Sequence, residues 1–369
     1  MEVSLTEKKL NTGRQLEADA VKFFAVTFMV IVNFYQQLSG YDCEHVFPDS
    51  FFRNAIEFIG GPLAEPVFMF AMGIGMIYRR KSTPADLIKH GGILMLTGYL
   101  LNFFRHTVQQ LIGYAAGIVE NPDLIDSFLC VDLLIFSGMA YITVGLMKKI
   151  KLFPVHILGI SVLLQAAGMW STKLPMQPGV IQGLIGLFVP TGRLTSFPLT
   201  VWLIYPAMGM VFGEFLMKCN DKSKLYGKLM ISSAGFFAAF TAGLLYVGYD
   251  IRNIYALYED TYYHQNIVSV LWIAPIIVFV LGACHFLFGK TAERPIGRFI
   301  GYCSDNMKII YIIQWLIIAY TVTAFMLLDI EDIYSPLIII AGGIVVMAVS
   351  VLISVPIVKI KMKMRNKKA

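Results

Sequence analysis

Ten apolar segments, each close to the length needed to cross a lipid bilayer, constrain this sequence more than any other feature. A transmembrane helix needs about 20 predominantly apolar residues. Hydrophobic residues make up 57% of the chain and charged residues only 15%, and no long polar stretch remains that could form a soluble domain. We therefore expect an all-α fold, with a single polytopic membrane domain over residues 1–369 and about ten transmembrane helices. The segments cover residues 20–38, 56–78, 91–111, 130–147, 152–170, 197–217, 226–248, 267–288, 307–327 and 335–358.

The positions of the lysines and arginines predict the orientation of these helices. With the N-terminus in the cytoplasm, 23 of the 30 Lys and Arg residues fall on the inner side of the membrane. This bias follows the positive-inside rule and predicts that both termini are cytoplasmic, as tails over residues 1–19 and 359–369. The net charge of +6 is then explained by topology, and nucleic acid is not an expected partner. The apolar piece 180–190 is too short to span and predicts a re-entrant or interfacial turn.

Polar side chains at membrane depth are the first candidates for chemistry. Asn33 lies inside the first apolar segment, where an amide needs either a hydrogen-bond partner or a function. An interhelical hydrogen bond is the alternative explanation for it. His45, His106 and His264 are all predicted on the outer side, where an imidazole can act as a general base near neutral pH. Spacing alone does not decide which of the three histidines would act.

Three further polar residues are candidates for binding or structural roles. Glu65, at the start of the second segment, needs a partner if it is buried, and we expect that partner to be Arg105. This pair is either structural or part of a site for an acceptor substrate. Gln314, inside the ninth segment, either bonds a neighbouring helix or donates to a developing oxyanion.

Basic residues at the inner ends of the helices, among them Lys22, Arg79, Arg80 and Arg298, have two explanations. Topology and anionic lipid account for such a set by default. The same charges can also hold the phosphates of a nucleotide cofactor that enters from the cytoplasm. The sequence has no P-loop, HExxH or GxSxG motif, and its five cysteines lack metal-ligand spacing. We therefore expect no metal site.

Several blocks of the sequence resemble one family. Asp19-x-x-Lys22, followed by Asn33 and His45, is similar to the first catalytic-domain span of the heparan-alpha-glucosaminide N-acetyltransferase family, in which arginine takes the place of Lys22. The block PVFMFAMGIGMIYRRK from Pro66 resembles the next helix of that family. FPLTVWLIYPAMG and DNMKIIYIIQW resemble later blocks. Members of the broader transmembrane acyltransferase group usually carry histidine where Asn33 and Gln314 stand here.

This resemblance implies a membrane-bound acetyltransferase that takes acetyl-CoA from the cytoplasm and acetylates an amino or hydroxyl group of an extracytoplasmic sugar or glycan. His45 would be the general base or a transient acetyl carrier, and Asn33 would donate to the thioester carbonyl. His106, His264, Arg105 and Glu65 would lie on the acceptor side. Lys22, Arg79, Arg80, Arg298 and Gln314 would bind the cofactor.

The same sequence leaves two other functions open. A transporter or flippase of a lipid-linked sugar would use a similar cavity without chemistry. A degenerate, non-catalytic member is favoured by the missing histidines. The expected location is the plasma membrane of a bacterium, with the lipid bilayer as a partner, and homodimer formation is left open.

Overall fold

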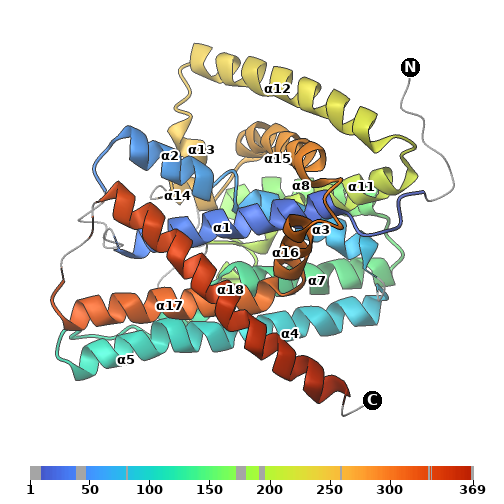
Figure 1. The fold of residues 1–369 in the computed structure, drawn as a ribbon. Helices are drawn as coiled ribbons and strands as arrows, with labels where there is room; N and C mark the ends of the chain where they lie inside the picture. Colours follow the sequence, from blue (N-terminus) through green and yellow to red (C-terminus); the bar gives the residue numbers. More distant parts are fainter. Residues whose placement is uncertain are drawn as a thin grey trace.

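A computed structural model of the protein describes residues 10–38, 47–79, 82–171, 180–190, 196–257, 260–330, 333 and 335–366. Over these ranges the chain forms α-helices and one π-helical turn, without a strand. Figure 1 shows these helices as one bundle. The predicted all-α class, with a polytopic bundle of membrane-spanning helices, is therefore confirmed.

All ten segments predicted to span the membrane are helical. Eight of them, among the described residues, are long and apolar enough to cross a bilayer, whereas α7 and α8 are shorter. The segments correspond to α1 (Leu16–Leu38), α2 (Phe51–Gly60) with α3 (Glu65–Tyr78), α4 (Pro84–Asn102) with the π-helical turn η1 (Phe103–Thr107) and α5 (Val108–Ala115), α7 (Leu133–Lys149), α8 (Pro154–Ser171), α10 (Leu199–Trp202) with α11 (Ile204–Lys218), α12 (Lys222–Tyr246), α15 (Ile267–Phe288), α17 (Met307–Leu327) and α18 (Pro336–Asn366).

Shorter helices lie between these segments. They are α6 (Leu124–Leu129), α9 (Val180–Gly186), α13 (Arg252–Tyr255), α14 (Asp260–Tyr263) and α16 (Pro295–Asp305). The seven-residue helix α9 falls within the apolar piece 180–190 and packs against α6. At about 1.5 Å per residue it is too short to span a bilayer, in agreement with the sequence.

The start of α1 and the end of α18 lie at the same end of the bundle (Figure 1). The first and last helices are therefore arranged as expected for a chain that enters and leaves the bundle at one end, while the predicted position of the two termini stays a prediction. Because most of the basic residues belong to the helix ends on this side, we name it the inner end and the opposite one the outer end.

Helix α1 occupies the centre of the bundle. It packs against α3, α15, α16, α17 and α18 (Figure 1), and most of its residues are buried. Helix α12, in contrast, packs mainly on α15 and lies at the edge. Side chains of α1 therefore reach the interior of the bundle at every level between its two ends.

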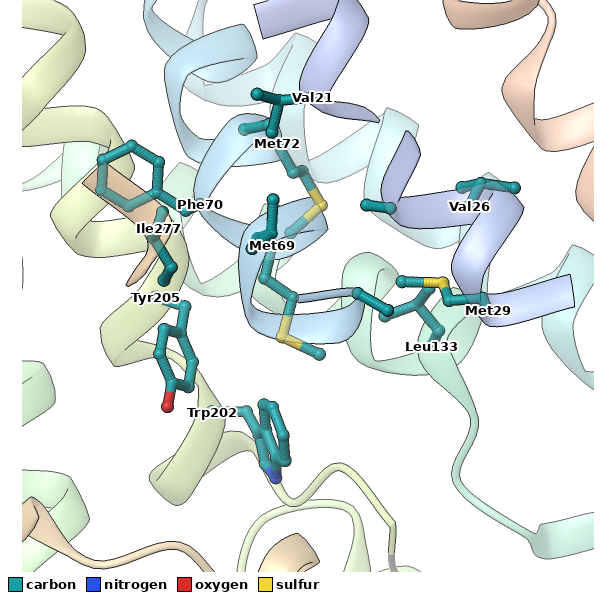
Figure 2. Packing of buried hydrophobic residues seen from close by; sticks show 14 of the residues in the cluster. Val21, Val26, Met29, Met69, Phe70, Met72, Leu133, Trp202, Tyr205 and Ile277 are labelled. Carbon is teal, nitrogen blue, oxygen red and sulfur yellow. The ribbon is translucent and has the colours of Figure 1, made fainter. Parts of the chain in front are cut away.

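The contact between α3 and α11 is close enough to exclude side chains. A Cβ atom added at Gly73 would lie 2.0 Å from the carbonyl oxygen of Pro206, and one added at Gly209 would lie 1.9 Å from that of Phe70. Met69 and Met72 of α3 belong to the same packed apolar cluster as Val26 and Met29 of α1 (Figure 2). Helix α3 thus combines a rigid backbone contact with α11 and flexible methionine side chains in the apolar cluster.

Candidate functional site

A cavity of about 420 Å³ opens towards the outer end of the bundle. Its lining combines amides, carboxylates and aromatic rings, a mixture suited to a hydroxyl-rich ligand. The polar and aromatic residues of the lining include Asn33 of α1, Glu65 of α3, Arg105 and His106 of η1, Asp126 of α6, Asp132 before α7, and Tyr311 and Trp315 of α17. We call this space the outer cavity.

Asn33 is brought to the outer cavity by its position on α1. Residues 22, 26, 29 and 33 follow helical spacing, so they share one face of the helix. The Asn33 side chain is buried to 9% exposure, lines the cavity and has no hydrogen-bond partner among the described residues. The interhelical hydrogen bond offered as the alternative explanation is therefore not formed within that part of the chain.

The π-helical turn η1 places two predicted residues at the outer cavity. A π-turn accommodates one extra residue in a helix, and such turns are frequent at functional sites. Arg105 is 3% exposed, His106 is half-buried, and both line the cavity. Nothing in the hydrophobic pattern of residues 91–111 indicates this turn, so sequence reasoning missed it.

The predicted ion pair between Glu65 and Arg105 is wrong. The Arg105 guanidinium lies 3.3 Å from the Asp132 carboxylate, and its Nη2 also donates to Asn102 Oδ1 at 3.1 Å. Glu65 instead accepts a hydrogen bond of 2.7 Å from the hydroxyl of Tyr262. The reason is the close packing of α4 on α7, which brings the start of α7 to Arg105.

Asp132 has two structural roles, neither of which was predicted. Its Oδ1 accepts hydrogen bonds of 3.0 Å from the backbone amides of Leu134 and Ile135, and so caps the N-terminus of α7. Its Oδ2 faces Arg105, whose guanidinium also stacks 4.1 Å from the ring centroid of Trp315. An acidic residue directly before an apolar helix was the sequence signal that could have identified this cap.

Only one of the three predicted outer histidines is described at the outer cavity. His106 lines it, whereas the half-buried His264 follows α14 and is not among the lining residues. His45 lies outside the described residues, so its predicted role stays a prediction.

Asp126 contributes a carboxylate near the mouth of the outer cavity. The short helix α6 begins at the Asp123 cap, and Asp126 is buried to 7% exposure. Burial raises the pKa of Asp126 above its ordinary value, and the nearby negative charge of Asp123 raises it further. Protonation of this carboxyl is therefore easier in the folded protein than in the unfolded chain.

At the inner end, a cavity of about 540 Å³ surrounds the other end of the same face of α1. Lys22, Asp19, Arg14 and Asp305 line it, and we call it the inner cavity. Asp19 pairs with Arg14, whose Nε lies 2.5 Å from its Oδ2. Lys22 has no ion-pair partner among the described residues, and its ammonium group lies beside Gly75.

The other predicted cofactor residues are divided between this end and the core. Arg298 lines a neighbouring cavity of about 390 Å³, which shares Arg14 and Asp305 with the inner cavity. Arg79 lies over the ring of Tyr141, 5.8 Å from its centroid, and lines none of the three cavities.

Gln314 and Arg80 complete the set of predicted cofactor residues. Gln314 is fully buried and lines none of the three cavities, and neither polar atom of its side chain has a hydrogen-bond partner within the described ranges. Arg80 lies outside the described residues.

Comparison with protein-family models, with curated proteins and with solved structures finds no match for this chain.

Proposed function

We propose that this chain is a membrane-bound acyltransferase that moves an acetyl group from cytoplasmic acetyl-CoA to an amino or hydroxyl group of an extracytoplasmic sugar. One observation carries the proposal: a single face of α1 presents Lys22 to the inner cavity and Asn33 to the outer cavity. The two residues are eleven positions apart, or about 16 Å along the helix. A donor held at one end and an acceptor held at the other can thus be brought to one helix face.

The inner end supplies the charges that a nucleotide thioester requires. Lys22 and Arg298 line adjoining cavities at this end, and Arg14 borders both. Cationic side chains form strong, charge-assisted hydrogen bonds with phosphate oxygens. Because Lys22 has no ion-pair partner in the described part of the chain, its ammonium group remains available to an anion.

The outer cavity supports a sugar as the acceptor. Amides and carboxylates line it together with the rings of Phe197, Tyr263 and Trp315. Amide and carboxylate groups bond hydroxyl and amino groups, while aromatic faces cover the apolar face of a sugar ring.

Transfer would proceed by attack of the acceptor nitrogen or oxygen on the thioester carbonyl. The new bond to carbon forms, the carbon–sulfur bond breaks, and the thiolate leaves. The proton lost by the acceptor passes to a base, for which His45 is the proposed residue and His106 the described histidine at the cavity. Asn33 would donate a hydrogen bond to the carbonyl oxygen as it becomes negative.

The test uses the purified full-length protein in liposomes, with acetyl-CoA on the inner side and a panel of amino sugars outside. The expected result is a mass increase of one acetyl group in at least one sugar. Asn33→Ala should lower the rate about 100–1000-fold, as loss of an oxyanion donor typically does. Gln165→Leu, which removes a buried amide that lines none of the three cavities, is the matched control and should leave the rate unchanged.

Two outcomes would contradict the proposal. Movement of a lipid-linked sugar across the bilayer without acetylation would indicate a transporter. An Asn33→Ala variant that transfers acetyl groups at the wild-type rate would remove the oxyanion role of that residue.

A further inference from the structure

Apolar residues of α1 and α3 lie between the linings of the inner cavity and the outer cavity along both helices. On α1, Val26 and Met29 lie four and seven residues beyond Lys22 on the same face, and their side chains are 0% and 3% exposed. On α3, Phe68 and Met72 lie at helical spacing between Glu65, which lines the outer cavity, and Gly75, which lines the inner one. We call these four side chains the septum.

The septum is thin. Met29 already lines the outer cavity and Lys22 the inner cavity, so the two linings are seven residues apart on α1, or about 10 Å. Figure 2 shows Val26 and Met29 on α1 and Met72 on α3, with Leu133 beside Met29. These side chains belong to one packed apolar cluster.

The walls of the septum differ in stiffness. The backbones of α3 and α11 touch at Gly73 and Gly209, which leaves no space for α3 to move further towards α11. Met29 and Met72 carry unbranched thioether chains with three rotatable bonds, whereas the branched chain of Val26 is stiff. Opening between the cavities is therefore expected from rotation of the two methionines.

We propose that Met29 and Met72 form a passage for the thioester end of the acyl donor, and that their size determines which acyl groups reach Asn33. The inference rests on the proposed acyl transfer and adds the residues that select the acyl chain. The phosphate-bearing part of the donor stays with the cations at the inner end, while its slender arm crosses the septum. When the methionines pack together, their apolar side chains keep water from the thioester.

The first test measures acyl selectivity. Met29→Ala and Met72→Ala should raise the ratio of butyryl to acetyl transfer about tenfold or more, because each methylene in an apolar pocket contributes about 1–3 kcal/mol to discrimination. Met210→Ala is the matched control, since Met210 is fully buried on α11 and lines neither cavity. An unchanged ratio in both septum variants would overturn the assignment.

The second test does not depend on catalysis. Met29→Cys is made in a protein whose five native cysteines are replaced, and a membrane-impermeant thiol reagent is added on the outer side. Coenzyme A on the inner side should abolish labelling at position 29, because its arm fills the septum. Gln37→Cys, further out in the same cavity, should remain labelled.

The two tests separate failure of the passage from failure of the proposed function. If wild-type protein transfers no acyl group but coenzyme A protects position 29, the enzyme proposal fails and the passage stands. If transfer occurs but coenzyme A leaves labelling at position 29 unchanged, the passage proposal is overturned.

Discussion

Replacing Asp132 by asparagine removes one charge of its ion pair with Arg105 while keeping the oxygen that caps α7. The two side chains are 6% and 3% exposed, so water solvates the remaining guanidinium less well than the carboxylate did. Removing one member of a buried ion pair typically costs about 3–5 kcal/mol. The cap is preserved because asparagine and aspartate are equally favourable at that position, whereas Asp132→Ala should lose about 1 kcal/mol more.

A double-mutant cycle isolates the contribution of the pair. Arg105→Met alone leaves the Asp132 carboxylate without its cation, while Arg105→Met with Asp132→Asn removes both charges. We therefore expect the double variant to be less destabilised than the sum of the two single variants, by well over about 0.5 kcal/mol.

The assay is unfolding by SDS in mixed micelles, followed by circular dichroism. Arg252→Gln is the control, because its pair with Asp49 is exposed at 38% and 61% and should contribute at most about 1 kcal/mol. Additive effects of Arg105→Met and Asp132→Asn would refute the interpretation that these charges form one buried unit.

Three further predictions follow from individual positions. Gly73→Ala should lower the free energy of unfolding by about 1–3 kcal/mol, because its Cβ would meet a backbone carbonyl. Gly159→Ala, whose Cβ would have nothing within 4 Å, should raise the free energy of unfolding by about 0.5–1 kcal/mol. Equal effects of the two substitutions would contradict the close contact of α3 and α11. Burial and the nearby Asp123 raise the pKa of Asp126. The wild-type protein should therefore lose stability relative to the Asp126→Asn variant as the pH rises from about 4 to 7. A difference in melting temperature between the two proteins that does not change with pH would contradict this prediction. Gln314→Met should raise the melting temperature, because a buried amide without hydrogen-bond partners typically lowers the free energy of unfolding by about 1–3 kcal/mol. A lower melting temperature of the variant would indicate that the amide is hydrogen-bonded.

The helices could be predicted from the sequence because the signals that specify them are local. Each apolar segment carries its own length and hydropathy, and every one of the ten became helical. The first residue of a helix was harder to predict where a side chain that caps the helix N-terminus determines it. Residues 130–147 were predicted as a span, but α7 begins at Leu133, because the Asp132 side chain bonds the first amides of the helix.

The candidate site could be predicted only in part, because its pairings depend on packing between distant segments. Asn33 was identified from a single amide in an apolar run, and it does line the outer cavity. The partner of Arg105 was missed, since Asp132 is 27 residues away in the chain and meets it through the packing of α4 on α7. No sequence pattern indicated η1, which sets the direction of the Arg105 side chain.

Buried polar atoms without hydrogen-bond partners occur in several helices of the described part of the chain, and those at the outer cavity have a physical explanation. At the outer cavity, Arg105 Nε and Nη1 on η1 and Trp315 Nε1 on α17 are buried without hydrogen bonds within the described residues, whereas others, such as Glu57 Oε2 and Gln165 Nε2, lie elsewhere. Asn33 faces the outer cavity, which these two elements also line. Each such group lowers stability, and apolar replacements of similar size would pack as well. A bundle that needed only to be stable would not retain several of them around one cavity. Their retention there is expected if the cavity receives a polar ligand that supplies the missing hydrogen bonds, because proteins commonly give up stability at functional sites.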